Sequence, residues 1–206
     1  RSGRFTHKRN MKNWQTITVG EYQYLMKIIH SDMDEFEKEI QVCACLKGCT
    51  PTDIEAMTFG GFIDLKKEIS WIFSDPPKAK PVRKWKRYKF IYDIRKINTG
   101  RYASIQFFLQ AGLVDNLHNL AATIIKPRWR RYDATRHEDY AEDIKDAPFL
   151  SVYSGLVFFC RLFIEFIRVN LDRITEPKMK ETLIYLRHNL DGLFMLNDLQ
   201  STSDAH

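Results

Sequence analysis

The sequence has no apolar stretch of membrane-spanning length. The longest run without a charged residue is 147–160, fourteen residues that end before Arg161. A transmembrane helix needs about 20 predominantly apolar residues, so we expect no membrane span. In the first residues, no basic stretch is followed by the apolar segment and small-residue cleavage site of a signal peptide, so we expect no secretory signal.

Cysteine is scarce, with four residues at positions 43, 45, 49 and 160. A zinc site needs a C-x-x-C pair and a second ligand pair at suitable spacing, and the six histidines form no such pair. Cys43 and Cys45 fall roughly 200° apart on a helix, which prevents them from sharing a metal ion. We therefore expect reduced, partly buried thiols in a cytosolic protein, with no bound metal and no cofactor.

Catalytic signatures are missing as well. The sequence contains no GxSxG, P-loop, HExxH or GxGxxG motif, and no HxE with a C-x-x-C partner. Carboxylate pairs such as Glu138/Asp139 lie on a predicted solvated helix, where acid–base chemistry is not expected. We therefore expect that the protein is not an enzyme.

Positive charge, by contrast, is concentrated. The formal net charge is +6, and the segment KAKPVRKWKRYKF at 78–90 holds seven lysines and arginines, so the rest of the chain would sum to −1. Hydrophobic residues make up 44% and charged residues 28% of the 206 residues, as in soluble globular proteins.

Helical periodicity dominates two long parts of the chain. Apolar residues recur at helical spacing, and Thr18 with Glu21 and Thr135 with Glu138 predict capping boxes at helix starts. We predict a mainly α fold, a helical bundle with a short strand near 16–19 and a longer one near 87–95. The predicted organisation is a basic arm (1–13), a small bundle of four short helices (14–74), a basic linker and strand (75–97), a second helical bundle (98–200, including a last helix from Pro177) and a tail (201–206).

The longer predicted strand has one apolar face, formed by alternate residues: Tyr88, Phe90, Tyr92 and Ile94. A lone strand cannot leave its backbone groups unpaired, and the only obvious mate inside the chain is TITV at 16–19. We therefore expect that 87–95 pairs partly with a neighbouring subunit, which would bury this face. An intramolecular hairpin that follows a solvated linker remains the alternative.

The most apolar predicted helix runs from about Phe149 to Ile174. Its charged residues form a single stripe of alternating sign, which indicates a structural or inter-subunit ion ladder. The stripe consists of Arg161, Glu165, Arg168 and Asp172. Its apolar faces predict a central helix or one shared with a neighbour. We expect it to bury nearly all of Leu156, Phe159, Leu162, Phe163 and Phe166.

Two basic segments interleave cations with aromatic rings, a pattern that suits nucleic acid because cations neutralise phosphates and rings stack on bases. The candidate electrostatic contacts are Lys78, Lys80, Arg83, Lys84 and Lys86 in the first segment, and Arg128, Arg130 and Arg131 in the second. No helix-turn-helix, zinc finger or RNP motif accompanies them. Nonspecific contact with DNA or an acidic partner is therefore favoured over base-specific recognition.

Loose motifs in 14–73 resemble the tail-assembly-chaperone-like family of tailed phages. They are TVG before a helix at 18–20, the acidic start DEFEKE at 34–39, LKG at 46–48 before DIEAM, and WIF at 71–73. The segments 99–129 and 156–163 resemble small proteins encoded among the head–tail genes of crAss-like phages of Bacteroidetes. The two likenesses together cover about three-quarters of the chain.

This resemblance implies a non-enzymatic phage virion protein of the portal–tail region, made in the host cytoplasm. The expected partners are portal or tail components, further copies in a homo-oligomeric ring, and packaged DNA, but no membrane. One alternative is a tail assembly chaperone that holds a tail protein before assembly. A second alternative, of another class, is a nucleic-acid-binding protein.

Overall fold

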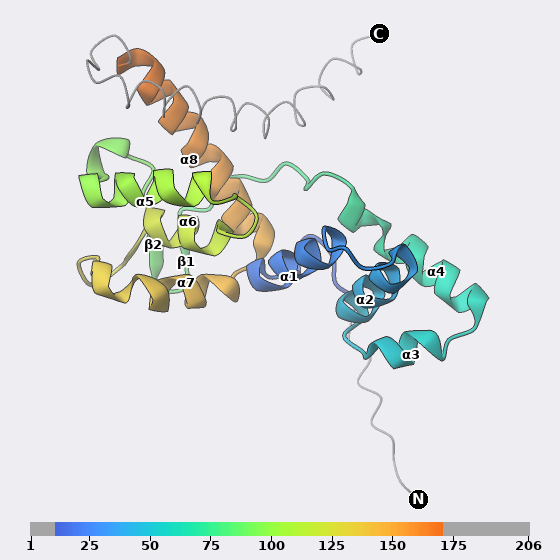
Figure 1. Cartoon of the computed structure of the whole chain (residues 1–206). Helices are drawn as coiled ribbons and strands as arrows, with labels where there is room; N and C mark the ends of the chain where they lie inside the picture. The colour runs from blue at the N-terminus through green and yellow to red at the C-terminus, as the bar shows by residue number, and fades with distance from the viewer. Residues whose placement is uncertain (1–10, 171–206) are drawn as a thin grey trace, which may run out of the picture.

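The computed structural model describes residues 11–170, apart from the side chains of Ile164, Ile167, Arg168 and Asn170. Within this range the chain is mainly helical, with eight α-helices and a small antiparallel sheet of three strands, so the predicted fold class is confirmed. Figure 1 shows helices α2–α4 on one side of the molecule and α5–α8 with the sheet on the other, and α1 lies between them. The predicted last helix and tail lie outside the described residues.

The N-terminal part contains the four short helices expected there: α1 (Val19–Ile29), α2 (Glu35–Lys47), α3 (Pro51–Glu55) and α4 (Phe59–Ile69). The predicted capping box at Thr18 and Glu21 is confirmed, and Thr50 with Asp53 forms another at the start of α3. Each such cap stabilises a helix by about 0.5–2 kcal/mol. Gly48 ends α2 with a φ of 69°, a left-handed conformation that glycine adopts without strain.

Helices α5 (Thr99–Gln110), α6 (Leu117–Ile124), α7 (His137–Lys145) and α8 (Phe149–Asn170) form the second part. Helix α6 is central, and its Leu120, Ala121 and Ile124 are fully buried. Helix α1 packs against α2 and also against α6, α7 and α8. Helix α1 therefore packs against both parts. The buried residues of both parts, which include Val19 of α1 and Phe163 of α8, belong to one hydrophobic core.

The sheet consists of β1 (Lys84–Trp85), β2 (Tyr88–Phe90) and β3 (Ile125–Pro127), with β2 in the centre. Tyr88 pairs with Trp85 on one side and Pro127 on the other, and Phe90 pairs with Ile125. Tyr88 and Phe90 face the core, while Lys89 between them is exposed. The sheet is small, but all of it is built from this chain.

The expectation that 87–95 pairs with a neighbouring subunit is therefore wrong. Both edges of β2 are already paired within the chain, so it has no free edge to offer. The intramolecular hairpin, which was the alternative, forms between β1 and β2. The strand is also shorter than predicted, because the Asp93 side chain accepts a hydrogen bond from the Arg95 amide and starts a 3-10 helix at Ile94–Lys96.

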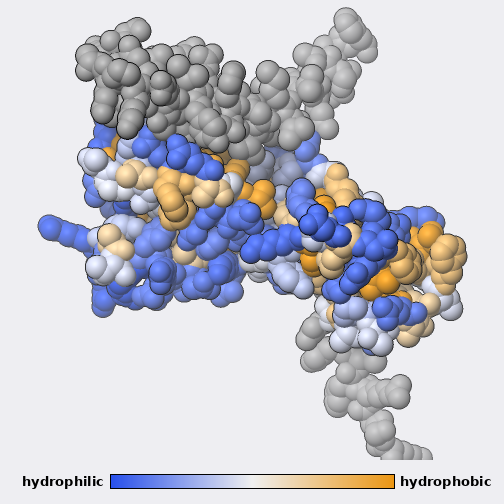
Figure 2. Space-filling view, viewed as in Figure 1, coloured by the Kyte–Doolittle hydropathy of each residue, from blue (hydrophilic) through white to orange (hydrophobic). Residues whose placement is uncertain are grey.

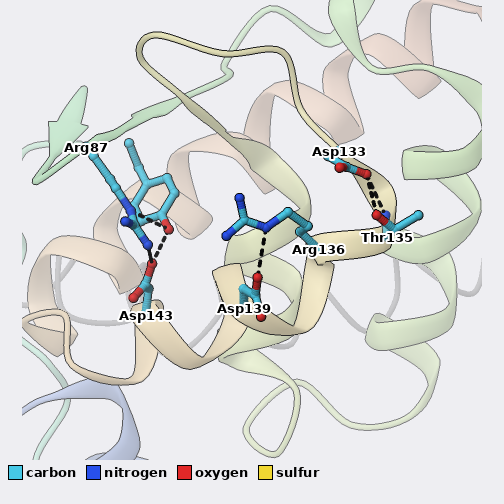
Figure 3. A network of polar contacts seen from close by, with 7 residues as sticks. Arg87, Asp133, Thr135, Arg136, Asp139 and Asp143 are labelled. Atoms are coloured by element: carbon cyan, nitrogen blue, oxygen red, sulfur yellow. Dashed lines mark hydrogen bonds and ion pairs between the residues drawn. The ribbon is translucent and has the colours of Figure 1, made fainter.

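Three other expectations are corrected. Residues 16–19 form no strand, because Thr18 caps α1 and Val19 begins it, and only an isolated bridge joins Thr18 to Pro148. Within the predicted arm, Lys12 instead contacts the bundle through its amide, which donates to the Leu46 carbonyl at 3.3 Å. The expected cap at Thr135 is absent: its hydroxyl donates to Asp133, and α7 begins only after Arg136 (Figure 3).

Helix α8 meets its prediction in part. Leu156, Phe159 and Phe163 are buried as expected. Leu162 is only half-buried and Phe166 is 43% exposed, so nearly complete burial of these two is wrong, because both lie off the face that packs on the core. Arg161 and Glu165 are exposed, and the other two residues of the charged stripe lie outside the described side chains and residues.

Candidate functional site

A large hollow lies beside the exposed face of the sheet. It encloses about 920 Å³ and is bounded by the linker that leads into β1, the sheet, the turn after β2 and helix α8. Six of its lining residues are cationic: Lys80, Arg83, Lys84, Lys89, Lys96 and Lys126. We call this hollow the basic groove.

Three of these cations form a row across the sheet. Lys84 of β1 pairs in register with Lys89 of β2, which in turn pairs with Lys126 of β3. All three side chains are exposed. Like charges directly opposite one another destabilise a sheet, so this lysine row is an arrangement that stability alone does not favour. Rules of local stability are most often broken where a surface has a function.

Asp93 is the one acidic residue that lines the basic groove. It is already engaged by Arg95 at 2.9 Å and by Lys96 at 3.3 Å. The hydrogen bond from Arg95, supported by Lys96, lowers the pKa of Asp93 to about 2. Within the described part of the chain, the remaining five lining cations form no ion pair. The residues that the structure describes thus leave the positive charge of the groove uncompensated.

The linker side of the groove is held in place by contacts to its backbone. The Tyr92 hydroxyl donates to the Val82 carbonyl at 2.6 Å, and the Ser154 hydroxyl donates to the Lys80 carbonyl at 3.3 Å. Burial raises the pKa of Tyr92 to about 12, so its hydroxyl keeps this proton at neutral pH. Gly155 of α8 makes room for Tyr92, because a Cβ at this position would lie 2.9 Å from the hydroxyl oxygen.

The opposite face of the sheet is anchored to α7. Arg87 and the Tyr88 hydroxyl both donate to the Asp143 carboxylate (Figure 3). Burial alone would raise the pKa of Asp143, but the hydrogen bonds from Tyr88 and Arg87 outweigh it and lower the pKa. These contacts fix the hairpin, whose turn residue Lys86 has a φ of 45° and places its ammonium 4.6 Å from the Trp85 ring centroid.

The second basic segment forms an exposed loop after β3, which we call the arginine loop (residues 128–131). Its start is fixed because the Arg128 amide donates to the Arg87 carbonyl at 2.8 Å. Its end is fixed by Tyr132, whose ring lies 3.6 Å from the buried Arg101 guanidinium and whose hydroxyl is 2.9 Å from His137 Nδ1. Trp129, at 83% exposed, has the highest exposure among the large hydrophobic residues described.

The structure places the predicted basic site residues in four different locations. Lys80, Arg83 and Lys84 line the basic groove, while Lys78 lies in an adjoining hollow of about 270 Å³ with Arg161. Lys86 lies at the hairpin turn, and Arg128, Arg130 and Arg131 lie in the arginine loop. Of the predicted strand face, Tyr88 and Phe90 are core residues, and Tyr92 and Ile94 are half-buried.

Sequence reasoning missed Lys89, Lys96 and Lys126. The alternation of the strand could have placed Lys89 on the exposed face, opposite Tyr88 and Phe90. For Lys126 the sequence held no such signal, because β3 continues directly from α6 and its partner strand is more than thirty residues away.

An apolar pocket of about 220 Å³ lies far from the groove, between α2, α3 and α4. Its lining residues are Phe36, Ile40, Ile54, Glu55, Met57, Phe59 and Phe62. Figure 2 shows hydrophobic surface gathered over this end of the molecule. Phe59 is 78% exposed and Phe36 is 59% exposed, which is unusual for rings in a cluster and indicates a contact surface.

The described residues show neither a metal-binding cluster nor a reactive thiol. No group of three or more His, Cys, Asp or Glu side chains in 11–170 is placed to hold a metal ion. Burial raises the pKa of Cys43 to about 11 and that of Cys160 to about 12, so both remain thiols at neutral pH. The described helices include none with the length and apolarity needed to cross a membrane.

No protein-family model matches the sequence, and no curated protein or solved structure matches it either.

Proposed function

We propose that this chain is a non-enzymatic binding protein whose basic groove lies against the sugar–phosphate backbone of nucleic acid. The observation that carries the proposal is the lysine row: three exposed lysines in register on three adjacent strands, with no carboxylate partner in the described part of the chain. A polyanion bound in the groove would supply the missing negative charge along the whole row.

The spacing of the row suits a phosphate chain. Neighbouring strands lie about 4.8 Å apart, so Lys84, Lys89 and Lys126 span about 10 Å across the sheet. Successive phosphates of one DNA strand rise about 3.4 Å along the helix axis and lie farther apart through space, so the row spans about two of them. Lys80 and Arg83 extend the charged wall along the linker. The described polar lining of the groove consists mainly of cations that suit phosphates, so we expect binding to be independent of base sequence.

The sequence resemblance suggests where the protein acts. We propose that it is a structural component of the portal–tail region of a phage particle, where it forms a ring next to other portal or tail proteins. The polyanion in the groove would then be packaged DNA. The single hydrophobic core, and the packing of α1 against both parts of the chain, support a rigid structural role.

The proposal is tested by fluorescence anisotropy with a labelled DNA of random sequence. A variant with Lys84→Gln, Lys89→Gln and Lys126→Gln removes the row. The matched control, Lys27→Gln, Lys67→Gln and Lys145→Gln, removes the same charge from other elements. We expect the first variant to bind at least tenfold more weakly and the control to bind like the wild type within about twofold, apart from the general effect of net charge. Equal binding by both variants would refute the role of the row.

A tail assembly chaperone is the second candidate, favoured by the exposed apolar pocket, which is suited to holding an unassembled partner. Mass spectrometry of purified virions separates the two. A structural component is found in the particle at a fixed copy number, whereas a chaperone is present in infected cells and absent from particles.

A further inference from the structure

The arginine loop, with its exposed Trp129, and the apolar pocket lie at opposite ends of the molecule, and their properties are complementary. In Figure 1 the connection between β3 and α7, which contains the arginine loop, lies at the left end, and α3 and α4 lie at the right end. The first end presents a projecting tryptophan among arginines, and the second presents the apolar pocket. Neither feature is part of the basic groove.

The apolar pocket has the size of one large side chain. Its volume of about 220 Å³ is below the roughly 300–1,000 Å³ of small-molecule sites. Its floor is Ile40 and Ile54, which are buried, and its rim includes Phe36 and Phe59, which are exposed. Phe36 meets Phe62 edge-on, with ring centroids 5.8 Å apart. The exposed edges and faces of these rings suit an aromatic occupant.

The arginine loop presents such a side chain in a fixed position. Trp129 projects from a loop that is tied at one end to Arg87 in the turn before β2, and at the other end to Arg101 and His137. The guanidinium of Arg128 lies 5.1 Å from the ring centroid of Trp129. Because both ends of the loop are clamped, little conformational entropy is lost when the ring inserts into a partner. Tryptophan and arginine are also the residues that most often dominate the energy of protein interfaces.

Carboxylates at the pocket rim are opposite in charge to the arginine loop. Two cations also touch the pocket lining: Lys66 lies over the Phe62 ring but is paired with Glu39, and Lys47 contacts Met57. Glu55 lines the pocket, and Glu37 follows Phe36 at its rim; both are exposed and neither forms an ion pair in the described part of the chain. Arg130 and Arg131, beside Trp129, are likewise exposed and without an ion pair there. Electrostatic complementarity of this kind favours the approach of the arginine loop to the pocket. The basic groove, which has the same sign of charge as the loop, would repel it.

We infer that the occupant of the apolar pocket is Trp129 of a second copy of this chain. The contact is head-to-tail, because each copy offers its arginine loop to one neighbour and its pocket to another. Such a contact closes into a ring when the rotation between copies allows it, and otherwise forms a filament. This inference deepens the proposed structural role, on which it rests, and it is independent of nucleic-acid binding in the basic groove.

The experiment is sedimentation velocity of the full chain between about 1 and 100 µM, with two variants. Trp129→Ala removes the inserted ring and leaves the pocket, and Phe59→Asp places a charge in the pocket and leaves Trp129. Both positions are exposed, so both variants are expected to keep the helical circular dichroism spectrum of the wild type. The wild type is expected to form species larger than a dimer, and each variant to associate at least about 30-fold more weakly.

A mixture of the two variants gives the sharpest result. The intact Trp129 of one variant still fits the intact pocket of the other, so the mixture is expected to form one-to-one dimers that grow no further. Phe107→Asp, at an exposed ring outside both features, is the matched control and is expected to assemble like the wild type.

Several outcomes overturn the inference. They are a wild type that stays monomeric over the whole range, variants that assemble normally, and a mixture that remains monomeric. A Trp129→Ala variant that assembles normally and binds DNA more weakly would assign the arginine loop to nucleic acid. DNA binding is measured on the same samples, so failure of the groove and failure of this contact are read separately.

Discussion

Lys89 of β2 lies directly opposite Lys126 of β3, and both side chains are exposed. Together with Lys84 on the other side of β2, they form the lysine row. A sheet selected only for stability would place a threonine or a carboxylate at the central position. The row is therefore the place where the requirements of binding and of stability oppose each other.

This opposition predicts the effect of Lys89→Glu. The new carboxylate would face an ammonium on each side, and each opposite-charge pair across strands contributes about 0.2–1 kcal/mol. We expect the free energy of unfolding to rise by about 0.5–1 kcal/mol, measured by urea denaturation, while DNA binding falls below that of Lys89→Gln. A variant that is both less stable and equally able to bind DNA would contradict the account of the row.

Phe159 tests the core of the second part. Its side chain is fully buried in α8, with its ring stacked on Phe163 at a centroid distance of 5.8 Å. Truncation by Phe159→Ala is expected to cost about 3–5 kcal/mol of unfolding free energy. Phe158→Ala, at the preceding position, is the control. Its side chain is 37% exposed, so the substitution should lower the unfolding free energy much less. Similar losses for the two variants would show that α8 packs through a different face.

The sequence predicts the helices of this chain well and its sheet poorly, for a physical reason. The box at Thr18 and Glu21 is visible because a cap depends on residues three positions apart. Strand β3 cannot be recognised in the sequence, because Ile125–Pro127 shows no alternation of apolar and polar residues. It becomes a strand only by pairing with β2. Because β3 cannot be recognised in the sequence, the sequence suggests a neighbouring subunit as the partner of β2, which the structure shows to be wrong.

The same limit applies to the candidate site. The basic composition of 78–90 is evident from the sequence and draws attention to Lys80, Arg83 and Lys84, which line the groove. The row itself depends on the register of three strands, which joins Lys126 to the segment only in the folded chain. Composition thus predicts that this surface is basic, whereas its shape and the absence of carboxylate partners require the structure.

Gly155 is expected to be coupled to Tyr92. In Gly155→Ala the new methyl group would lie 2.9 Å from the Tyr92 hydroxyl oxygen, which forces the ring away from the Val82 carbonyl. Overpacking of this kind costs about 1–3 kcal/mol, partly offset by the roughly 1 kcal/mol that alanine gains in a helix. In a double-mutant cycle, Gly155→Ala should cost less when Tyr92→Phe has already removed the hydroxyl. Additive losses would show that the two residues are not coupled.

Acid should weaken the fold through His137 and His118. Burial lowers the pKa of both rings from 6.5, and nearby cations lower it further, chiefly Arg101 for His137. The unfolded chain therefore binds these protons at a higher pH than the folded chain does. The stability contributed by the neutral rings is present above about pH 6.5 and is lost as the pH falls through their lower folded pKa values.

Urea denaturation between pH 7.5 and 5 measures this loss. His137→Gln is expected to make stability less dependent on pH in this window, because one of the two protonation sites is gone. Phe107→Ala, at an exposed ring that carries no ionisable group, is the control and should leave the dependence unchanged. An unchanged pH dependence in His137→Gln would show that this ring does not contribute.

The salt dependence of DNA binding tests the central claim most directly. Each phosphate contact in duplex DNA contributes about 0.9 to the slope of log K against log salt concentration. Five cations of the basic groove form no ion pair among residues 11–170. With these five engaged, we expect a wild-type slope near −4.5. Removal of the lysine row by the triple glutamine variant should bring it to about −2. A shallow slope in the wild type, or the same slope in the wild type and the variant, would contradict the proposal that this groove binds nucleic acid.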